Sequence, residues 1–298
     1  MTEIVPKEAE ALLSWQGLLQ ALEAGHRLPL SDIKDMFLYR DKDTILNRGA
    51  WIDGLGALVK AATIFPGNAA RGLPTIYGVV SLFDDVTGDL NALVDFHLVT
   101  KWKTAGDSLL SASRLARKDA REFLLVGAGA VARSMVEAYS AVFPEARFTV
   151  WSRTRESAAA MGLPVAGDLE AAVRKADVIC SATMATQPLI KGDWLQPGQH
   201  IDLIGAYKPG MREVDDRAMQ RARIFVDSRK TTLHHIGELM DPIASGAITE
   251  ADVVADFYDD PALYARRSDD EITIAKNGGG AHLDLMTASY IAGRWRAR

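Results

Sequence analysis

The 298-residue sequence contains one cysteine, no long hydrophobic run and no block of basic residues. The lone cysteine, Cys180, excludes an internal disulfide and any metal site built from several cysteines. No apolar stretch reaches the roughly 18 residues that a membrane span needs. Residues 1–10 carry acids and a proline where a secretion signal would have basic and then apolar residues. We therefore expect a cytoplasmic protein in which Cys180 is a small buried hydrophobic residue.

The charge of the chain argues against two classes of partner. The formal net charge is −5, and the lysines and arginines are scattered along the sequence. Neither nucleic acid nor an anionic membrane is expected as the main partner of such a chain. With 48% hydrophobic residues the chain can bury a large core, so small molecules are the expected ligands.

The hydrophobic pattern of the first third of the chain changes twice. Residues 7–25 are rich in helix formers and predict one or two helices. Residues 35–99 hold short apolar runs separated by glycine and proline turns, which predicts a largely antiparallel sheet with a hairpin loop at 84–89. A helical pattern returns at 104–117.

From residue 121 onward, strand-like and helix-like segments alternate. The expected strands cover residues 123–126, 147–152, 177–183, 200–205, 223–228 and 271–274. The expected helices cover residues 131–142, 154–161, 168–175, 213–222 and 231–240, followed by a helical tail. Such alternation predicts the α/β class, with a Rossmann-type doubly wound parallel sheet.

A glycine-rich turn joins the first of these strands to its helix. Gly127 permits the tight turn, Gly129 lets the backbone approach a pyrophosphate, and Ala132 allows close packing of the helix. The strand before the turn and the helix after it give the motif its expected context. We assign the cofactor site to the whole turn and first helical residues: Gly127, Ala128, Gly129, Ala130, Val131 and Ala132.

The end of the second strand distinguishes NAD from NADP. An NAD site usually has an acid there that binds the ribose 2′-hydroxyl. This chain has Ser152, Arg153, Thr154 and Arg155, with no acid before Glu156. Arginine grips a phosphate through two hydrogen bonds, so NADP(H) is favoured over NAD(H). The alternative is that both arginines are solvated at the start of a helix.

The motifs together resemble those of the ornithine cyclodeaminase/mu-crystallin family over nearly the full length of the chain. The resembling segments are residues 59–68, 71–74, 100–105, 126–129, 176–183 and 204–213. Thr183, which ends one of these segments, is assigned to the cofactor site with Ser152, Arg153 and Thr154. The resemblance implies a discontinuous α+β domain, residues 1–117 and 279–298, that binds substrate and forms a homodimer, and a Rossmann domain at residues 118–278.

Two positions depart from the pattern that the resemblance implies. Lys103 stands where most of the family has an arginine that grips the substrate carboxylate, and Tyr207 stands where members that convert amino acids have an acid. Lys103 therefore keeps a positive charge at the first position, whereas Tyr207 provides no negative charge at the second.

The expected substrate site contains Lys60, Lys103, Thr104 and Tyr207. Lys60 lies in an apolar strand, where an ammonium is stable only if it meets an anion. We expect a helix to begin at Thr104, so that Lys103, the Thr104 hydroxyl and free helix amides converge on one carboxylate. Lys60 is also the best candidate for the proton donor. The alternative is that both lysines reach solvent.

Other polar residues stay undecided or carry no role. His97 and Asp107 are close in sequence to Lys103, but an ordinary sheet histidine and a surface aspartate are the simpler interpretation. The two histidines at 234–235 have no acidic or cysteine companion at ligand spacing, so no metal is assigned. The segment 276–280 either meets the nicotinamide or joins the domains.

Three functions are compatible with these residues. The favoured one is an NAD(P)H-dependent reductase of a small imino acid, such as Δ1-pyrroline-2-carboxylate or Δ1-piperideine-2-carboxylate, giving the L-amino acid. The second is ornithine cyclodeaminase, which has to hold a cationic amine, a task that suits an acid better than Tyr207. The third is a non-catalytic binder of ligand and cofactor.

Overall fold

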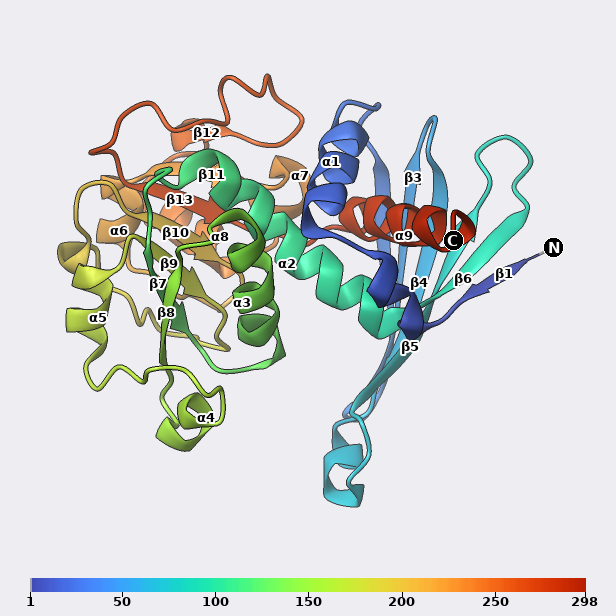
Figure 1. Ribbon diagram of the computed structural model, residues 1–298, viewed down its shortest axis with the longest axis horizontal. Coiled ribbons are helices and arrows are strands. Elements are labelled where there is room, and N and C mark those ends of the chain that lie inside the picture. The colour runs from blue at the N-terminus through green and yellow to red at the C-terminus, as the bar shows by residue number, and fades with distance from the viewer. Residues whose placement is uncertain (1) are drawn as a thin grey trace. The chain divides into compact units, whose positions relative to one another are not determined.

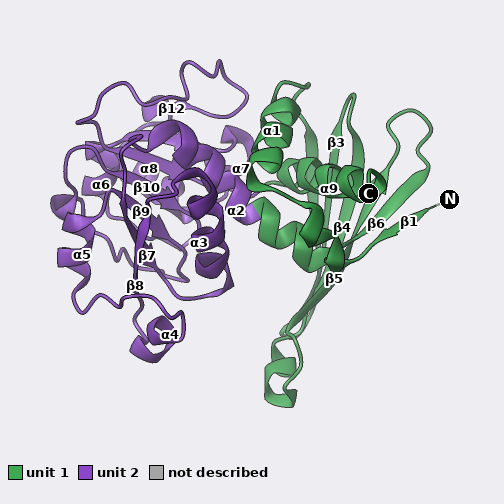
Figure 2. Cartoon of the chain, viewed as in Figure 1, with its two compact units in different colours: residues 1–103, 280–298 green, residues 104–279 purple. Residues whose placement is uncertain are grey.

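The computed structural model describes residues 2–298 and divides them into two compact units. Unit 1 contains the residues up to Lys103 and Gly280–Arg298, and unit 2 contains Thr104–Gly279 (Figure 2). From the sequence we expected divisions after residues 117 and 278. The first division instead falls inside helix α2 (Phe96–Leu115), which is continuous across it.

Unit 1 is built on a six-stranded sheet with the order β1-β6-β5-β4-β3-β2. The strands are β1 (Glu3–Val5), β2 (Asp32–Arg40), β3 (Asp43–Ile52), β4 (Gly56–Ile64), β5 (Ile76–Phe83) and β6 (Leu90–Asp95). All neighbours pair antiparallel except β1 and β6. The predicted antiparallel sheet is confirmed, and so is the hairpin loop between β5 and β6. The Asp84 carboxylate closes that loop by accepting the backbone N–H groups of Val86 and Thr87.

One face of this sheet is covered by helix. Unit 1 contains α1 (Trp15–His26), the start of α2, α9 (Ala281–Arg296) and two short 3-10 helices, Lys7–Leu12 and Pro66–Arg71. Helix α9 packs against strands β1 to β6 and against α1 (Figure 1). Side chains alternate across a strand, so Leu58, Lys60 and Ala62 of β4 are buried while Val59 is exposed on the opposite face.

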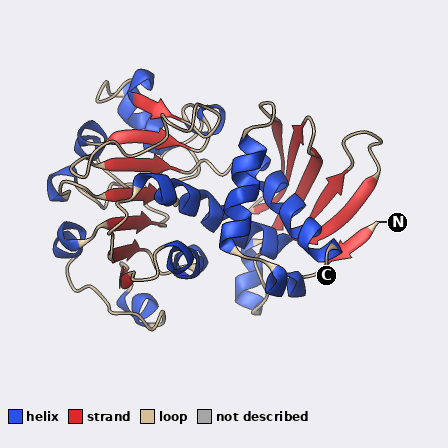
Figure 3. Cartoon of the chain, turned by 45° about the horizontal axis from the view of Figure 1, so that its top comes forward, coloured by secondary structure: helices blue, strands red, loops and turns tan. Residues whose placement is uncertain are grey.

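Unit 2 is a seven-stranded parallel sheet with the order β12-β11-β13-β10-β9-β7-β8. The strands are β7 (Glu122–Val126), β8 (Arg147–Trp151), β9 (Val178–Ser181), β10 (His200–Leu203), β11 (Arg223–Val226), β12 (Val253–Ala255) and β13 (Thr273–Lys276). The α-helices besides α2 are α3 (Ala130–Val142), α4 (Arg155–Ala159), α5 (Leu169–Lys175), α6 (Asp216–Arg221), α7 (Arg229–Thr232) and α8 (Gly237–Ala244), and two short 3-10 helices cover Gly192–Trp194 and Glu250–Asp252. Helices flank the sheet on both sides (Figure 3), which confirms the predicted α/β class.

Three details of unit 2 differ from the sequence prediction. Strand β12 was not predicted, the strand expected at 271–274 begins at Thr273, and the helix expected at 231–240 is two helices, α7 and α8. Every residue of β9, β10 and β13 is buried, because helices cover both faces of the sheet. Cys180 in β9 is buried, as expected. No helix found among residues 2–298 has the length and apolar character to cross a membrane.

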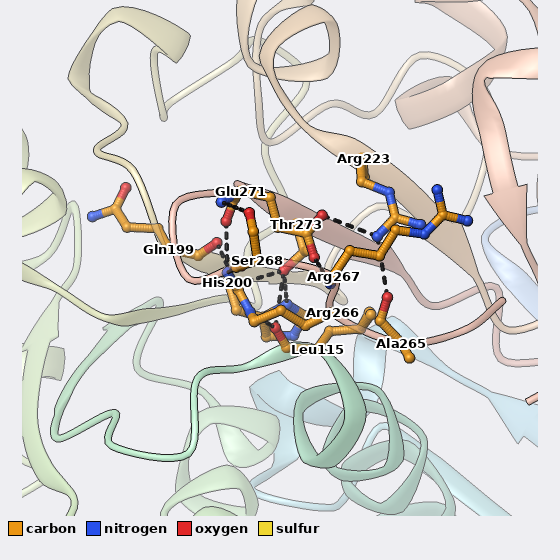
Figure 4. Close-up of polar contacts among 10 residues, drawn as sticks. All are labelled: Leu115, Gln199, His200, Arg223, Ala265, Arg266, Arg267, Ser268, Glu271 and Thr273. Atoms are coloured by element: carbon orange, nitrogen blue, oxygen red, sulfur yellow. Dashed lines mark hydrogen bonds and ion pairs between the residues drawn. The ribbon is translucent and has the colours of Figure 1, made fainter. Parts of the chain in front are cut away.

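Arg266 fixes the irregular segment that precedes β13 (Figure 4). Its guanidinium donates hydrogen bonds to the backbone carbonyls of Leu115 at 2.6 Å, Glu271 at 2.7 Å and Gln199 at 3.2 Å. Gln199 and Glu271 precede their strands, so this network lies at the amino ends of β10 and β13. Ligands of such sheets bind at the carboxyl ends of the strands, so we assign Arg266 a structural role.

Candidate active site

The glycine turn follows β7 at the carboxyl edge of the parallel sheet. Gly127 has φ +114°, and its N–H donates to the Trp151 carbonyl at 2.8 Å. A Cβ at Gly127 would lie 2.5 Å from the Ala182 carbonyl oxygen, so this position requires glycine. Gly129 is the N-cap of α3 and provides no side chain to the free amides of the first turn. Those amides are therefore available to an anion.

A cavity of about 480 Å³ opens at this turn, a size within the usual range for ligand pockets. Its lining is Gly127, Ala128, Gly129, Trp151, Ser152, Arg153, Thr154, Ala182, Thr183, Met184, Ala185, Thr186, Gln187 and Leu189. Seven of the ten predicted cofactor residues are in this set. The other three, Ala130, Val131 and Ala132, form the first turn of α3, where Ala132 is buried. A Cβ at Gly129 would meet nothing within 4 Å, so the space beside it is open.

The lining at the end of β8 contains a cation and no acid. Arg153 and Thr154 are exposed, and Ser152 is half-buried. Within the described residues that line the cavity, no aspartate or glutamate is present. The lining therefore suits an anionic group at this end.

A buried carboxylate, which the sequence reasoning missed, holds two loops at this edge. Glu213 Oε1 accepts hydrogen bonds from the Thr183 N–H and hydroxyl, each at 2.8 Å, and from Ser181 Oγ at 2.7 Å. Its Oε2 accepts from the N–H groups of Gly205 at 2.7 Å and Ala206 at 3.2 Å. The carboxylate thus fixes the segments after β9 and β10. The Arg212-Glu213 pair belongs to a resembling segment, but no local pattern in the sequence indicates this role.

A second buried acid supports the first. Glu238 accepts the Glu213 N–H at 2.7 Å and the Val214 N–H at 3.1 Å. Burial and the neighbouring Glu213 charge raise the pKa of Glu238 to about 7. Lys276 is fully buried nearby, and its ammonium donates to the Leu203 carbonyl at 2.8 Å. Burial lowers the pKa of Lys276, while Glu213 and Glu238 oppose the change.

In unit 1, the ammonium of Lys60 meets an acid that the sequence reasoning did not identify. Lys60 Nζ donates to Asp284 Oδ1 and to Thr100 Oγ1, both at 2.8 Å, and lies 4.7 Å from the centre of the Phe96 ring. Lys60 is 6% exposed. The apolar surroundings of Lys60 predicted an anion, and the structure provides one from the chain itself.

Lys103 belongs to the same cluster. It is buried, and its charge acts on both Lys60 and Asp284. Burial lowers the pKa of Lys60, Asp284 opposes this, and Lys103 adds to it. Burial alone would raise the pKa of Asp284, but Lys60, Lys103 and Arg48 outweigh it and hold that pKa below its usual value.

The expectation that a helix begins at Thr104 is wrong. Helix α2 begins at Phe96, where the Asp95 carboxylate accepts the Leu98 N–H at 2.7 Å. Thr104 therefore lies in the helix interior, and its backbone amide is not one of the free amides of a first turn. Only the side chains of Lys103 and Thr104 are left for the proposed substrate contact.

Tyr207 and Thr104 belong to unit 2, whereas Lys60 and Lys103 belong to unit 1. Tyr207 is 57% exposed in the loop that follows β10, and the Lys208 ammonium lies 5.7 Å from the centre of its ring. The loop is fixed at Gly205 and Ala206 by Glu213. Tyr207 is therefore displayed from an anchored turn.

Sequence comparison identifies relatives over almost the entire chain. The model of the ornithine cyclodeaminase/mu-crystallin family matches residues 53–298. The Δ1-pyrroline-2-carboxylate reductase of Paracoccus denitrificans is 54% identical over 297 residues, covering 96% of this chain and 94% of the relative. The ketimine reductase mu-crystallin of Mus musculus is 31% identical over 242 residues, covering 79% and 75%.

Comparison with solved structures also gives matches over almost the entire chain. An archaeal alanine dehydrogenase dimer with bound NAD is 27% identical and matches with a TM-score of 0.88, covering 99% of this chain and 96% of that chain. The iminosuccinate reductase of Paracoccus denitrificans in complex with NAD+ is 26% identical and matches with a TM-score of 0.87, covering 99% and 97%. The chain belongs to the ornithine cyclodeaminase/mu-crystallin family.

Proposed function

We propose that this chain is an NAD(P)H-dependent reductase that converts a small cyclic imino acid of the Δ1-pyrroline-2-carboxylate type to the L-amino acid. The observation that carries the proposal is 54% identity, over 96% of the chain, to a relative named for that activity. Two structural features support it. The cavity at the glycine turn of unit 2 suits a dinucleotide, and the buried pair Lys60 and Lys103 of unit 1 suits a carboxylate.

The residues at the glycine turn fit a cofactor pyrophosphate. The open space at Gly129 allows close approach, and the first turn of α3 offers amides without a side-chain cap. When bound, the nicotinamide supplies the hydride that reduces the carbon of the C=N bond. Glu213 keeps Thr183, part of the cavity lining, in one position.

Lys60 and Lys103 bind the carboxylate of the imino acid, with the Thr104 hydroxyl as a further contact. Lys60 also donates the proton: the N–H bond at Nζ breaks as a new N–H bond forms on the imine nitrogen. The lysine is left neutral and regains a proton from water after the product leaves. Tyr207 offers its hydroxyl to the substrate.

The residue type at position 207 also distinguishes the proposed reductase activity from ornithine cyclodeaminase activity. A cyclodeaminase binds a cationic amine, whose natural partner is a carboxylate, and Tyr207 cannot provide one. Asp284, the acid in the lysine cluster, already accepts a hydrogen bond from Lys60. This arrangement favours an imine substrate.

A substrate panel tests the function. Purified protein is mixed with NADPH or NADH and with Δ1-pyrroline-2-carboxylate, Δ1-piperideine-2-carboxylate, or a 2-oxo acid with an amine, and cofactor oxidation is followed at 340 nm. We expect the cyclic imines to be reduced fastest. Ornithine turned into proline with catalytic NAD and no reductant would identify a cyclodeaminase. Cofactor binding without oxidation across the panel would identify a binder.

We further propose that NADPH is the preferred cofactor. Arg153, Ser152 and Thr154 end β8 beside the cavity, with no acid in the lining to bind a ribose 2′-hydroxyl. A guanidinium and two hydroxyls are suitable partners for a 2′-phosphate.

We also propose that the protein is a homodimer formed through the sheet of unit 1. The face opposite α9 exposes a set of large apolar side chains: Met36, Leu38, Ile45, Trp51, Val59, Tyr77 and Val79. Contiguous apolar faces of this kind are uncommon on monomers. The archaeal relative described as a dimer has the same fold. Analytical ultracentrifugation should give twice the chain mass for the wild type, and a monomer for Val59→Glu.

A further inference from the structure

The charged residues around Lys60 form a row across the sheet of unit 1. Asp35 of β2, Arg48 of β3 and Lys60 of β4 are direct cross-strand partners. Cross-strand partners place their side chains on the same face, here the face that α9 covers. Arg48 Nε donates to both oxygens of the Asp35 carboxylate, at 3.0 and 3.2 Å, and its Nη2 donates to Oδ2 at 2.8 Å. Asp35 thus holds Arg48, and the next position in the row, Lys60, needs another anion.

That anion is Asp284, which α9 brings to the row from 224 positions along the chain. Asp284 is fully buried, and Lys60 Nζ donates to its Oδ1 at 2.8 Å. Its Oδ2 accepts no hydrogen bond from residues 2–298 and lies 4.0 Å from Arg48 Nη1. Within the described chain, Lys60 is therefore the hydrogen-bond donor to this carboxylate.

Asp284 remains charged although burial opposes ionisation. Lys60, Lys103 and Arg48 together keep its pKa low. Asp284 also lies in the first turn of α9, where the helix dipole favours a negative charge. The Asp284 carboxylate is therefore ionised at neutral pH, where it can serve as the counter-ion of the Lys60 ammonium.

We propose that Asp284 is a positioning residue for the reaction: it keeps Lys60 protonated and in one place, so that the ammonium has a proton to give to the imine nitrogen. The proposal rests on the reductase function proposed above, in which Lys60 is the proton donor. Without Asp284, Lys60 is a buried cation beside two others and releases its proton at a lower pH. Asp284 itself neither gives nor receives the proton.

The other ionisable groups at this cluster do not replace Asp284. Arg48 and Lys103 are cations and favour loss of the Lys60 proton. His282 of α9 is fully buried, and burial, with the neighbouring His26 and Lys103, holds its pKa well below its usual value. His282 is therefore neutral at the pH of the assay. Its ring meets that of His26 edge-on, with the ring centres 5.5 Å apart.

The test compares two ways of removing a contact from Lys60. Asp284→Asn removes the charge, whereas Thr100→Val removes the hydrogen bond at 2.8 Å and leaves the charge. The kcat and KM for the cyclic imine are measured with NADPH from pH 6 to 10. In Asp284→Asn, we expect the alkaline limb of kcat to move down by roughly one to three pH units, the usual effect of a close opposite charge. In Thr100→Val, we expect a lower plateau and an unmoved limb, and Asp284→Glu should restore most of the wild-type profile.

An NMR titration gives a readout that does not depend on turnover. The 13Cε and 15Nζ signals of Lys60, in protein labelled at lysine, report its charge directly. We expect wild-type Lys60 to be protonated at pH 7 and Asp284→Asn to lower its midpoint. A neutral Lys60 in the wild type at pH 7 would overturn the proposal however the variant folds. Equal midpoints in the wild type and in a folded Asp284→Asn would overturn it as well. If the wild type reduces no imine but the midpoint still moves, the proposed function fails while the role of Asp284 in holding the Lys60 proton stands.

Discussion

Replacing Glu238 by glutamine should change how the stability of the protein depends on pH. The pKa of Glu238 is about 7 in the folded chain, against 4.5 for an exposed glutamate. At a pH between these two values, Glu238 therefore keeps its proton in the folded state and has lost it in the unfolded state. The stabilising contribution is complete below pH 4.5 and is lost as the pH rises through 7. Between pH 5 and pH 8 the loss amounts to about 2 to 3 kcal/mol, because one pKa unit corresponds to about 1.4 kcal/mol.

Glu238→Gln removes this titration. The glutamine oxygen can accept one of the two backbone N–H groups that Glu238 now binds, while its NH2 group faces the other, a penalty that does not vary with pH. The free energy of unfolding, measured by urea titration at each pH, should therefore fall by about 2 to 3 kcal/mol less in the variant than in the wild type from pH 5 to pH 8. Asp241→Asn, which removes an exposed carboxylate from the same helix, should follow the wild-type curve. Parallel curves for the wild type and Glu238→Gln would refute the reasoning.

Three further predictions concern ligands. Gly129→Val should abolish calorimetric binding of both cofactors while its circular dichroism stays unchanged. Gly167→Val, which also adds a side chain in open space but away from this cavity, should bind both cofactors normally. Normal affinity in a folded Gly129→Val would exclude the glycine turn as the site. Arg153→Ala should weaken NADPH binding by ~1 kcal/mol or more and leave NADH unaffected, and equal losses would mean that Arg153 does not contact the 2′-phosphate. Lys103→Met should raise the KM for the imino acid by a factor that corresponds to on the order of 2–4 kcal/mol, without changing cofactor affinity. Lys101→Met, which breaks a half-buried pair with Glu10, should leave KM unchanged, and equal KM values for the wild type and Lys103→Met would remove Lys103 from the site.

The Rossmann unit could be predicted because its signals are local. A buried strand, a glycine turn and an amphipathic helix follow one another within residues 122–142, and each is specified by its own residues. The start of α2 was harder to predict, because strand β6 runs directly into it without a glycine or proline. Asp95, whose carboxylate caps the Leu98 amide, was the available signal.

The partner of Lys60 could not be predicted from local sequence. The apolar strand around Lys60 implied an anion, and we assigned that role to the substrate carboxylate. Asp284 lies in a different element 224 positions away, and only the packing of α9 on the sheet joins the two. Periodicity predicts which face of a strand is buried, but it does not identify the side chain that covers that face.

Lys276 shows why a buried lysine is an ambiguous signal. Like Lys60 it lies in an apolar strand, and both ammonium groups are close to acids. The Lys276 ammonium donates to the Leu203 carbonyl, and the acids near it, Glu213 and Glu238, bind backbone N–H groups of their own. Removing Lys276 would therefore weaken a network that holds the sheet and its loops. Lys60 donates to two side chains, those of Thr100 and Asp284, and to no backbone carbonyl in the described chain. In the described chain, no donor other than Lys60 forms a hydrogen bond with the Asp284 carboxylate. Because neither group holds a backbone segment in place, the Lys60 proton can be held and released without disturbing the fold.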